Sequence, residues 1–301
     1  PIIEPVGRVP NKELNPATLV ADLNIDQIYQ ALVLGIKDYF TKMGFTKAIL
    51  GSSGGIDSAV TLAIATDALG AQNVLAVLMP SEYSTEHSVD DAVLLSKNLD
   101  NPYHIVPIKS VYHSFLETLD PIFNGMPFSL AEENIQSRSR GNILMAIANK
   151  LGYVLLNTSN KSELAVGYGT LYGDMAGGLS VIGDLYKTEV YALCDHLNST
   201  RMRIPQNILT KAPSAELRPG QKDSDSLPDY DLLDRILFHH IEGKLGSSSM
   251  IEMGFDPEVV SKVLSLVSRS EYKRFQFAPI IRVSTKAFGT GRRYPLVASY
   301  S

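Results

Sequence analysis

The sequence predicts an α/β protein in which helices cover both faces of a parallel sheet. Between residues 47 and 156, short apolar runs alternate with segments whose apolar residues recur at helical spacing. The turns that join these segments are short. Strands that alternate with helices in this way are joined by crossover connections and therefore run parallel. Such sheets bind ligands at the carboxyl ends of their strands, so the residues that follow each strand are the first candidates for a functional site.

Each element is expected from the spacing of its apolar residues. Four strands are expected at the short apolar runs 47–50, 73–79, 103–108 and 153–156. One helix should follow the third strand and run through Leu119, and the others should cover residues 25–43, 57–69, 86–99, 130–150, 186–198, 229–241 and 256–268. Asn24 is expected to cap the first helix, because a short polar side chain there can accept from the first-turn N–H groups.

Two segments lack a periodic pattern. Residues 1–22 are rich in Pro and Asn, so we expect a linker or arm there and a single domain over residues 23–301. Residues 199–228 contain several prolines and few paired apolar residues. A stretch of this kind inside a domain is usually a functional loop or a disordered one.

Composition narrows the class of function. The formal net charge of −5 argues against a nucleic-acid partner, which usually requires a basic face, but leaves anionic small molecules open. No apolar run reaches the roughly 18 residues of a membrane span, and no signal pattern is present, so we expect no membrane association and a cytoplasmic protein or a piece of a longer one. The single cysteine, Cys194, lies among apolar residues of a predicted helix and is expected to be a buried, inert thiol.

The most specific motif is the phosphate loop, Gly-Ser-Ser-Gly-Gly-Ile-Asp-Ser at residues 51–58, which lies between a predicted strand and a predicted helix. Gly54 and Gly55 allow a tight turn and the close approach of a ligand. The serine hydroxyls and the free N–H groups of the following helix would surround a phosphate or pyrophosphate. Asp57 beside an anion requires a bridging cation, which we assign to Mg²⁺. The alternative is a Gly-rich turn in which Asp57 only caps the helix.

This loop is not a Walker loop, because the only Gly-Lys pair, Gly243-Lys244, is followed by Leu245. It resembles instead the Ser-Gly-Gly-x-Asp-Ser signature of the N-type ATP pyrophosphatases. That resemblance implies an adenine-nucleotide alpha-hydrolase-like fold and cleavage of ATP between its α and β phosphates. Ser52 stands where the signature has a small apolar residue, a change that a glycine turn tolerates.

Later segments narrow the resemblance. They are AEENIQSRSRGN at 131–142, TSNKSELAVGYGTLYGDMAGG at 158–178, GDLYKTEVY at 183–191 and KAPSAELRPGQKDSDSLPDYDLLD at 211–234. In this order, after such a loop, they are similar to the synthetase domain of the NAD synthetases, and most similar to the glutamine-dependent branch. The segments 271–279 and 286–295 are also similar to the end of that branch, so that the resemblance extends from about residue 24 to residue 297.

The resemblance implies roles for individual residues. The residues implied to bind ATP are Gly51, Ser52, Ser53, Gly54, Gly55, Ile56, Asp57, Ser58, Thr158, Lys187 and Ser214. Those implied to contact deamido-NAD are Asn134, Arg138, Glu163, Tyr168, Gly169, Thr170, Leu171 and Lys273. Asp57 and Glu163 are the implied Mg²⁺ ligands, and with Lys187 they are the implied catalytic residues. On their predicted helix, Asn134, Arg138 and Arg140 could line a cleft. The plainer alternatives are that Arg138 and Arg140 form a solvated helix face, that Glu163 supports a helix terminus and that Lys187 lies on the surface.

The family reaction amidates deamido-NAD. The nicotinate carboxylate attacks the α-phosphorus of ATP, pyrophosphate leaves, and ammonia converts the acyl-adenylate to NAD and AMP. A glutaminase domain, which the glutamine-dependent branch carries at its N-terminal side, is not found in these 301 residues, so free ammonia is the expected donor. Residues 211–228, and secondarily 81–89, are the expected lid that shields the adenylate from water. The resemblance also implies a homodimer or a higher homo-oligomer.

Two other readings stay open. One is another amidating enzyme with the same phosphate loop, such as a GMP or asparagine synthetase, which should lack the segment 158–178. The other is a module that binds adenine nucleotide without turning it over, which should have lost Asp57, Glu163 or Lys187.

Overall fold

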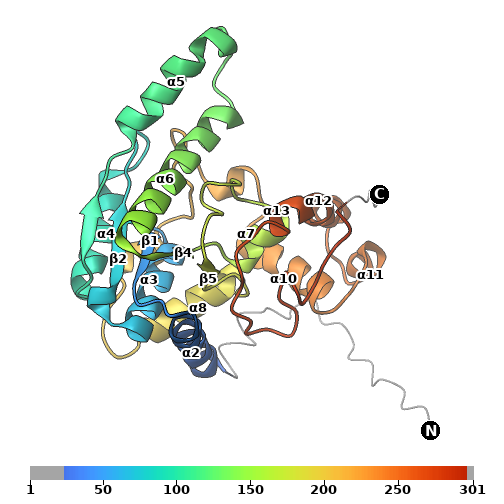
Figure 1. Ribbon diagram of the computed structural model, residues 1–301. Coiled ribbons are helices and arrows are strands. Elements are labelled where there is room, and N and C mark those ends of the chain that lie inside the picture. Colours follow the sequence, from blue (N-terminus) through green and yellow to red (C-terminus); the bar gives the residue numbers. More distant parts are fainter. Residues whose placement is uncertain (1–23, 297–301) are drawn as a thin grey trace.

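The computed structural model describes residues 24–296 (Figure 1). Its strands all run parallel, in the order β3-β2-β1-β4-β5. They are β1 (Ala48–Gly51), β2 (Val74–Leu78), β3 (Tyr103–Ile105), β4 (Val154–Asn157) and β5 (Leu179–Ser180). The predicted α/β class is therefore confirmed. The arm predicted at residues 1–22 lies outside the described residues.

Helices follow most of the strands and cover the sheet. They are α2 (Ile25–Met43), α3 (Ile56–Leu69), α4 (Glu86–Asn98), α5 (Lys109–Phe123), α6 (Leu130–Leu151), α7 (Lys161–Val166), α8 (Lys187–Asn198), α9 (Gln206–Thr210), α10 (Tyr230–Ile241), α11 (Ser247–Glu252), α12 (Pro257–Arg269) and α13 (Glu271–Arg274), with 3-10 turns at η1 (Ala71–Asn73) and η2 (Asp223–Asp225). None of the helices within residues 24–296 is long and apolar enough to cross a membrane.

Side chains alternate in direction along each strand, so the sheet has two apolar faces. On β1, Ala48 and Leu50 pack into the cluster that contains α2, α3 and α8, whereas Ile49 packs on the other face with Leu144 and Ala148 of α6. Successive strand residues point to opposite faces, so an uninterrupted apolar run is what a sheet covered on both sides requires.

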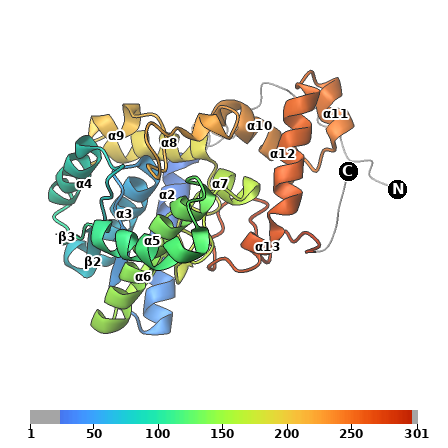
Figure 2. The same cartoon turned by 90° about the horizontal axis from the view of Figure 1, so that it is seen from above.

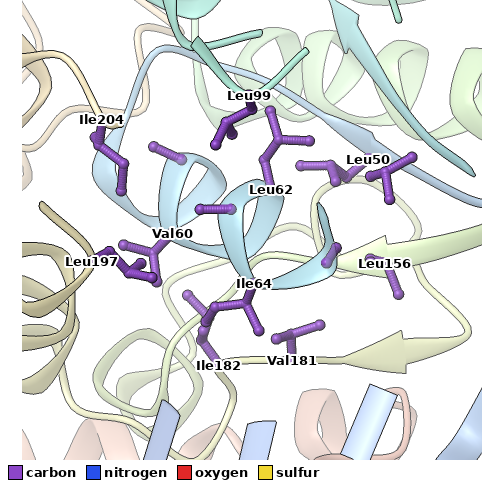
Figure 3. Packing of buried hydrophobic residues seen from close by; sticks show 14 of the residues in the cluster. Leu50, Val60, Leu62, Ile64, Leu99, Leu156, Val181, Ile182, Leu197 and Ile204 are labelled. Atoms are coloured by element: carbon purple, nitrogen blue, oxygen red, sulfur yellow. The ribbon is translucent and has the colours of Figure 1, made fainter. Parts of the chain in front are cut away.

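Helix α3 is the centre of the larger cluster. Its residues 58–65 are all buried, because the sheet covers one side of the helix and α2 and α8 cover the other. Figure 3 shows Val60, Leu62 and Ile64 of α3 surrounded by apolar side chains from the sheet and the neighbouring helices. A helix that is apolar all round is a buried helix, and here it carries the phosphate loop at its N-terminal end. The loop is thus anchored to a helix that is buried in the larger apolar cluster.

Helices α7, α10, α11 and α12 form a second apolar cluster beside the sheet (Figure 2). It includes Leu164 of α7, Leu237 of α10 and Val263 of α12. Cys194 lies in the first cluster, fully buried, and burial raises the pKa of its thiol to about 12. The prediction of an inert thiol agrees with this environment.

Several details of the prediction were wrong. The strand β5 was missed because it has only two residues, and the short helices α7, α9, α11 and α13 were missed for a similar reason. The segment 199–228 is not without structure, since it contains α9 and η2. Asn24 occupies the N-cap position of α2, but within the described chain its side chain makes no capping hydrogen bond.

Candidate active site

A cavity of about 280 Å³ lies at the carboxyl edge of the sheet, where β1 and β4 are neighbours. The strand order changes direction at this pair: β2 and β3 continue on one side of β1, and β5 continues on the far side of β4. Open α/β sheets bind ligands at such a switch point. The segments that follow the two strands, residues 51–58 and 157–159, both line the cavity.

The phosphate loop is held in a tight turn by its own serines. The Ser53 amide donates to Ser58 Oγ at 3.2 Å, and the Gly55 amide donates to Ser53 Oγ at 3.2 Å. Gly55 is the N-cap of α3, and in the described part of the chain no side chain caps this helix. The first-turn N–H groups are therefore available to an anion in the cavity. The alternative in which Asp57 caps the helix is wrong.

Gly54 is the one position in the loop where a side chain cannot be accommodated. Its φ is +77°, and a Cβ there would lie 2.3 Å from the backbone oxygen of Ser88. We expect Gly54→Ala to lower the free energy of unfolding by about 1–3 kcal/mol from the backbone conformation alone, with the clash adding to it. Gly55→Ala is the matched control, because Gly55 has a negative φ and its added Cβ would come no closer than 3.2 Å to Ser53 Oγ. Urea unfolding of both variants measures this, and equal losses would contradict the clash.

Lys187, the first residue of α8, connects the two strand-end segments. Its Nζ lies 2.5 Å from Asp57 Oδ2 and 3.8 Å from Glu163 Oε1. Asn160 Nδ2 donates to the other carboxylate oxygen of Asp57 at 2.9 Å, and the Asn160 side chain also caps α7, whose first turn contains Glu163. Lys187 is buried, so the reading of a surface lysine is wrong. The three residues implied to be catalytic therefore lie together.

The charges of this group are unevenly balanced. Burial alone would lower the pKa of Lys187, but the carboxylates of Asp57 and Glu163 outweigh it and raise that pKa. Burial, followed by the negative charge of Asp57, raises the pKa of Glu163 well above its usual value. Burial and the nearby charge of Asp57 thus both disfavour the ionised form of Glu163.

All residues predicted to bind ATP line this cavity. They are Gly51, Ser52, Ser53, Gly54, Gly55, Ile56, Asp57, Ser58, Thr158, Lys187 and Ser214. They come from β1, the loop after β1, the loop after β4, the start of α8 and the segment after α9. Their contacts with ATP remain a prediction.

The residues predicted to contact deamido-NAD form a surface that borders the cavity. Asn134 Oδ1 on α6 accepts from Thr170 Oγ1 at 2.7 Å, and Arg138 Nε donates to the Leu171 carbonyl at 3.2 Å. The Arg138 side chain is otherwise exposed to solvent. These bonds hold the loop after α7 against α6.

Lys273 of α13 supports the same loop from the other side. Its Nζ donates to the carbonyls of Gly167 and Gly169, at 2.7 Å each. Of the residues predicted to contact the dinucleotide, Glu163 and Tyr168 also line the cavity. The predicted dinucleotide surface is thus continuous with the predicted ATP site.

Several residues of this site were given no substrate role in the prediction, among them Asp223 and Arg140, and Arg140 was expected only to line a cleft. Asp223 accepts from the Tyr168 hydroxyl at 3.0 Å and from the Tyr230 hydroxyl at 2.9 Å, which joins the loop after α7 to α10. Arg140 lines the cavity and donates through Nε to the Met79 carbonyl at 3.0 Å. Arg140 lies two residues after Arg138 on one helix, so the sequence indicated it, whereas Asp223 in an irregular segment had no local signal.

The two predicted lid segments meet beside the phosphate loop. Glu216 Oε1 accepts from Ser88 Oγ at 2.7 Å and from Lys211 Nζ at 2.6 Å, so residues 211–228 and 81–89 are bonded to each other. Gln136 Nε2 of α6 also donates to the Leu217 carbonyl at 2.8 Å. Residues 211–217 and 223 line the cavity, so this segment forms part of its wall.

A parallel sheet with a serine-glycine loop at its switch point defines an adenine-nucleotide alpha-hydrolase-like fold, the class that solved relatives share. The family profile described as NAD synthase matches residues 28–277. The chain belongs to this NAD synthase family.

Known relatives agree with this assignment. The glutamine-dependent NAD(+) synthetase of Synechocystis is 54% identical over 278 residues, which cover 92% of this chain and 50% of that protein. A structure of the glutamine-dependent NAD+ synthetase of Acinetobacter baumannii with ADP is 47% identical, with a TM-score of 0.62 over 90% of this chain and 49% of that one. The NH3-dependent NAD synthetase of Campylobacter jejuni is 27% identical, with a TM-score of 0.67 over 83% of this chain and 96% of that one. The chain thus spans about half the length of the glutamine-dependent relatives.

Proposed function

We propose that this chain makes NAD from deamido-NAD, ATP and ammonia, with release of AMP and pyrophosphate. The observation that carries the proposal is the buried Lys187 ammonium between Asp57 and Glu163, beside a loop built to hold phosphate. Membership of the NAD synthase family supports the same reaction. A module that only binds nucleotide has no need of this buried charged group.

The residues suggest how the reaction proceeds. The nicotinate carboxylate attacks the α-phosphorus while the bond from that phosphorus to the β-phosphate bridging oxygen breaks. Lys187 and the free N–H groups of α3 stabilise the negative charge that develops on the departing pyrophosphate. Ammonia then attacks the carbonyl carbon of the adenylate, and AMP leaves. The walls formed by residues 211–217 keep water from the adenylate.

The carboxylates of Asp57 and Glu163 would suit Mg²⁺ if the phosphate oxygens of ATP supplied further ligands. Mg²⁺ is usually held by one or two carboxylates, with phosphate oxygens and water as its other ligands. No group of three or more His, Cys, Asp or Glu suited to a metal occurs in the part of the chain that the structure describes. Bound there, Mg²⁺ would neutralise phosphate charge and stabilise the leaving pyrophosphate.

Removal of the metal should abolish NAD formation, and Asp57→Asn should raise the Mg²⁺ concentration that gives half-maximal rate. The expected shift is about 10- to 100-fold, the range seen when even the support of a metal ligand is lost. Asp67→Asn is the matched control, because Asp67 lies on the same helix but pairs with Arg203 away from the cavity. A Mg²⁺ titration of initial rates measures both variants. An unchanged titration curve for Asp57→Asn would remove Asp57 as a metal ligand.

The reaction itself can be tested with purified chain, ATP, Mg²⁺ and ammonium. We expect NAD, AMP and pyrophosphate in equal amounts when deamido-NAD is the acceptor. Xanthosine monophosphate and aspartate, offered in its place, distinguish the other amidating enzymes. Bound ATP without turnover in any of these mixtures would instead favour the nucleotide-binding module.

Glutamine should not replace ammonium in that assay. The thiol of Cys194 is buried in the apolar cluster and its pKa is raised, so it cannot act as a nucleophile on glutamine. We propose that a glutaminase domain supplies ammonia if the chain is part of a longer protein, because the longer relatives are named glutamine-dependent.

We also propose a homodimer through α5 and α6. These helices and the turn between them expose a group of large apolar side chains, namely Phe115, Ile122, Met126, Phe128 and Leu130. Large apolar side chains exposed on neighbouring segments favour an interface, and a two-fold interface would bring α5 and α6 of two copies together. In Figure 1, α5 and the adjoining part of α6 project beyond the sheet, where a second copy can reach them.

The dimer should dissociate when a charge is placed in this surface. Ile122→Glu should reduce the molar mass in light scattering from two chains to one, because Ile122 is 73% exposed in the single chain. Met202→Glu is the control, since Met202 is 62% exposed but lies away from α5 and α6. A parent protein with the mass of one chain would contradict the proposal.

A further inference from the structure

The start of α8, which presents Lys187, rests on a chain of buried hydrogen bonds that leads away from the cavity. The backbone N–H of Lys187 donates to Ser162 Oγ at 2.9 Å, and this hydroxyl donates to Asp234 Oδ1 at 2.5 Å. The N–H and the hydroxyl of Thr188 both donate to Asp234 Oδ2, at 2.9 Å each. Ser162 and Asp234 are fully buried.

This arrangement satisfies the first N–H groups of α8, which have no partner within the helix. It also places a carboxylate at the positive end of the helix dipole. Lys187 is the residue whose N–H is held, and Ser162 precedes Glu163 in α7. One carboxylate on α10 therefore sets the position of two segments that face each other across the Lys187–Glu163 pair.

The chemistry of Asp234 suits this task and little else. Its buried neighbours on α10 are mostly apolar, among them Leu233, Ile236 and Leu237, and burying a carboxylate among them is costly unless its oxygens are bonded. Both oxygens are bonded, and all three donors belong to the starts of α7 and α8. An amide replaces it poorly, because the Ser162 hydroxyl would have to turn and accept from the amide N–H₂, and its own O–H would lose its acceptor.

We propose that Asp234 is a positioning residue for the phosphoryl chemistry: acting through Ser162 and Thr188, it holds the first turn of α8 so that the Lys187 ammonium meets the departing pyrophosphate. The proposal rests on the proposed function. It adds a residue that neither lines the cavity nor belongs to the phosphate loop.

A double-mutant cycle tests this action through Lys187. In the 301-residue chain, Asp234→Asn should lower kcat for NAD formation about 10- to 100-fold, since a misplacement of about 1 Å in a site has costs of this order. The KM for ATP should change much less, because the loop contacts remain. In a Lys187→Met background, followed with labelled deamido-NAD over hours, Asp234→Asn should change the rate less than about twofold, because residues that act as a unit are not additive. Equal fold-losses in the two backgrounds would mean a general structural role and would overturn the proposal.

Two further measurements keep the test decisive. Ser162→Ala removes only the bridging hydroxyl and should show the same dependence on Lys187, so a poorly folded Asp234→Asn does not end the test. Amide hydrogen exchange at Lys187 and Thr188 should become faster in either variant and stay at the parent rate in Asp67→Asn. Unchanged exchange together with unchanged kcat would exclude the positioning role. A parent chain that forms no NAD would contradict the proposed function instead, and the exchange measurement would still decide the role of Asp234.

Discussion

Lys187→Met is expected to lower kcat for NAD formation by roughly 10²- to 10³-fold, the loss seen when one preorganised donor to a developing oxyanion is removed. Methionine keeps most of the length of the side chain but has no charge to offer the departing pyrophosphate. The free energy of unfolding should change little by comparison with kcat. The side chains of Asp57 and Glu163 are 18% and 16% exposed, so water can solvate them from the cavity once Lys187 is removed. Single-turnover measurement of pyrophosphate release reports the affected step directly.

Two results would contradict the prediction for Lys187→Met. A Lys187→Met chain that releases pyrophosphate at the parent rate would show that Lys187 only balances the two carboxylates. A chain that no longer unfolds cooperatively would show that its main contribution is to stability. The first result would leave the phosphate loop as the site but would remove Lys187 from the chemistry.

Lys161→Met should have the reverse effect, a large loss of stability. Lys161 is fully buried, with Nζ 3.0 Å from Asp184 Oδ1 and 2.5 Å from Glu242 Oε1. Removal of one partner from a buried ion pair leaves uncompensated charge and costs about 3–5 kcal/mol. We therefore expect a fall of this size in the free energy of unfolding, measured by urea denaturation, while kcat of the folded fraction changes far less than in Lys187→Met.

An exposed pair provides the control. Lys42 Nζ lies 2.6 Å from Asp38 Oδ2, but both side chains are more than half exposed, and exposed pairs contribute about 0–1 kcal/mol. Lys42→Met should therefore leave the unfolding curve almost unchanged. If Lys161→Met behaves like Lys42→Met, the Asp184 and Glu242 carboxylates are stabilised by their other hydrogen bonds, and the ion pair is unimportant.

The regular part of the fold was predictable because each long element carries its own local pattern. Residues 25–43, for instance, place apolar side chains at helical spacing, and the structure has α2 at those positions. Short elements carry too few residues for a pattern. The two residues of β5 and the six of α7 are specified by neighbours, such as the β4 strand to which β5 is hydrogen bonded.

The residues of the site also differ in how far the sequence predicted them. The phosphate loop could be predicted because a contiguous run of glycine and serine favours a tight turn by itself. The structure places this loop beside the cavity. Lys187 and Glu163 were indicated only through the family resemblance, and neither residue alone differs from an ordinary surface charge. Asp223 and Asp234 lie in the segment 211–234 that contributed to the resemblance, but no role was assigned to them, because their partners lie in other helices and loops.

By itself, then, the sequence determined the class of the sheet, the helix that carries the loop and the membership of the NAD synthase family. The tertiary structure alone decided which charges meet. The sequence patterns that specify helices and strands extend over a few residues. The Lys187–Asp57 contact, in contrast, joins positions 130 residues apart and depends on the packing of α8 against α3. Such a pair can form only when folding brings the start of α8 against the start of α3, so its existence is a property of the tertiary structure.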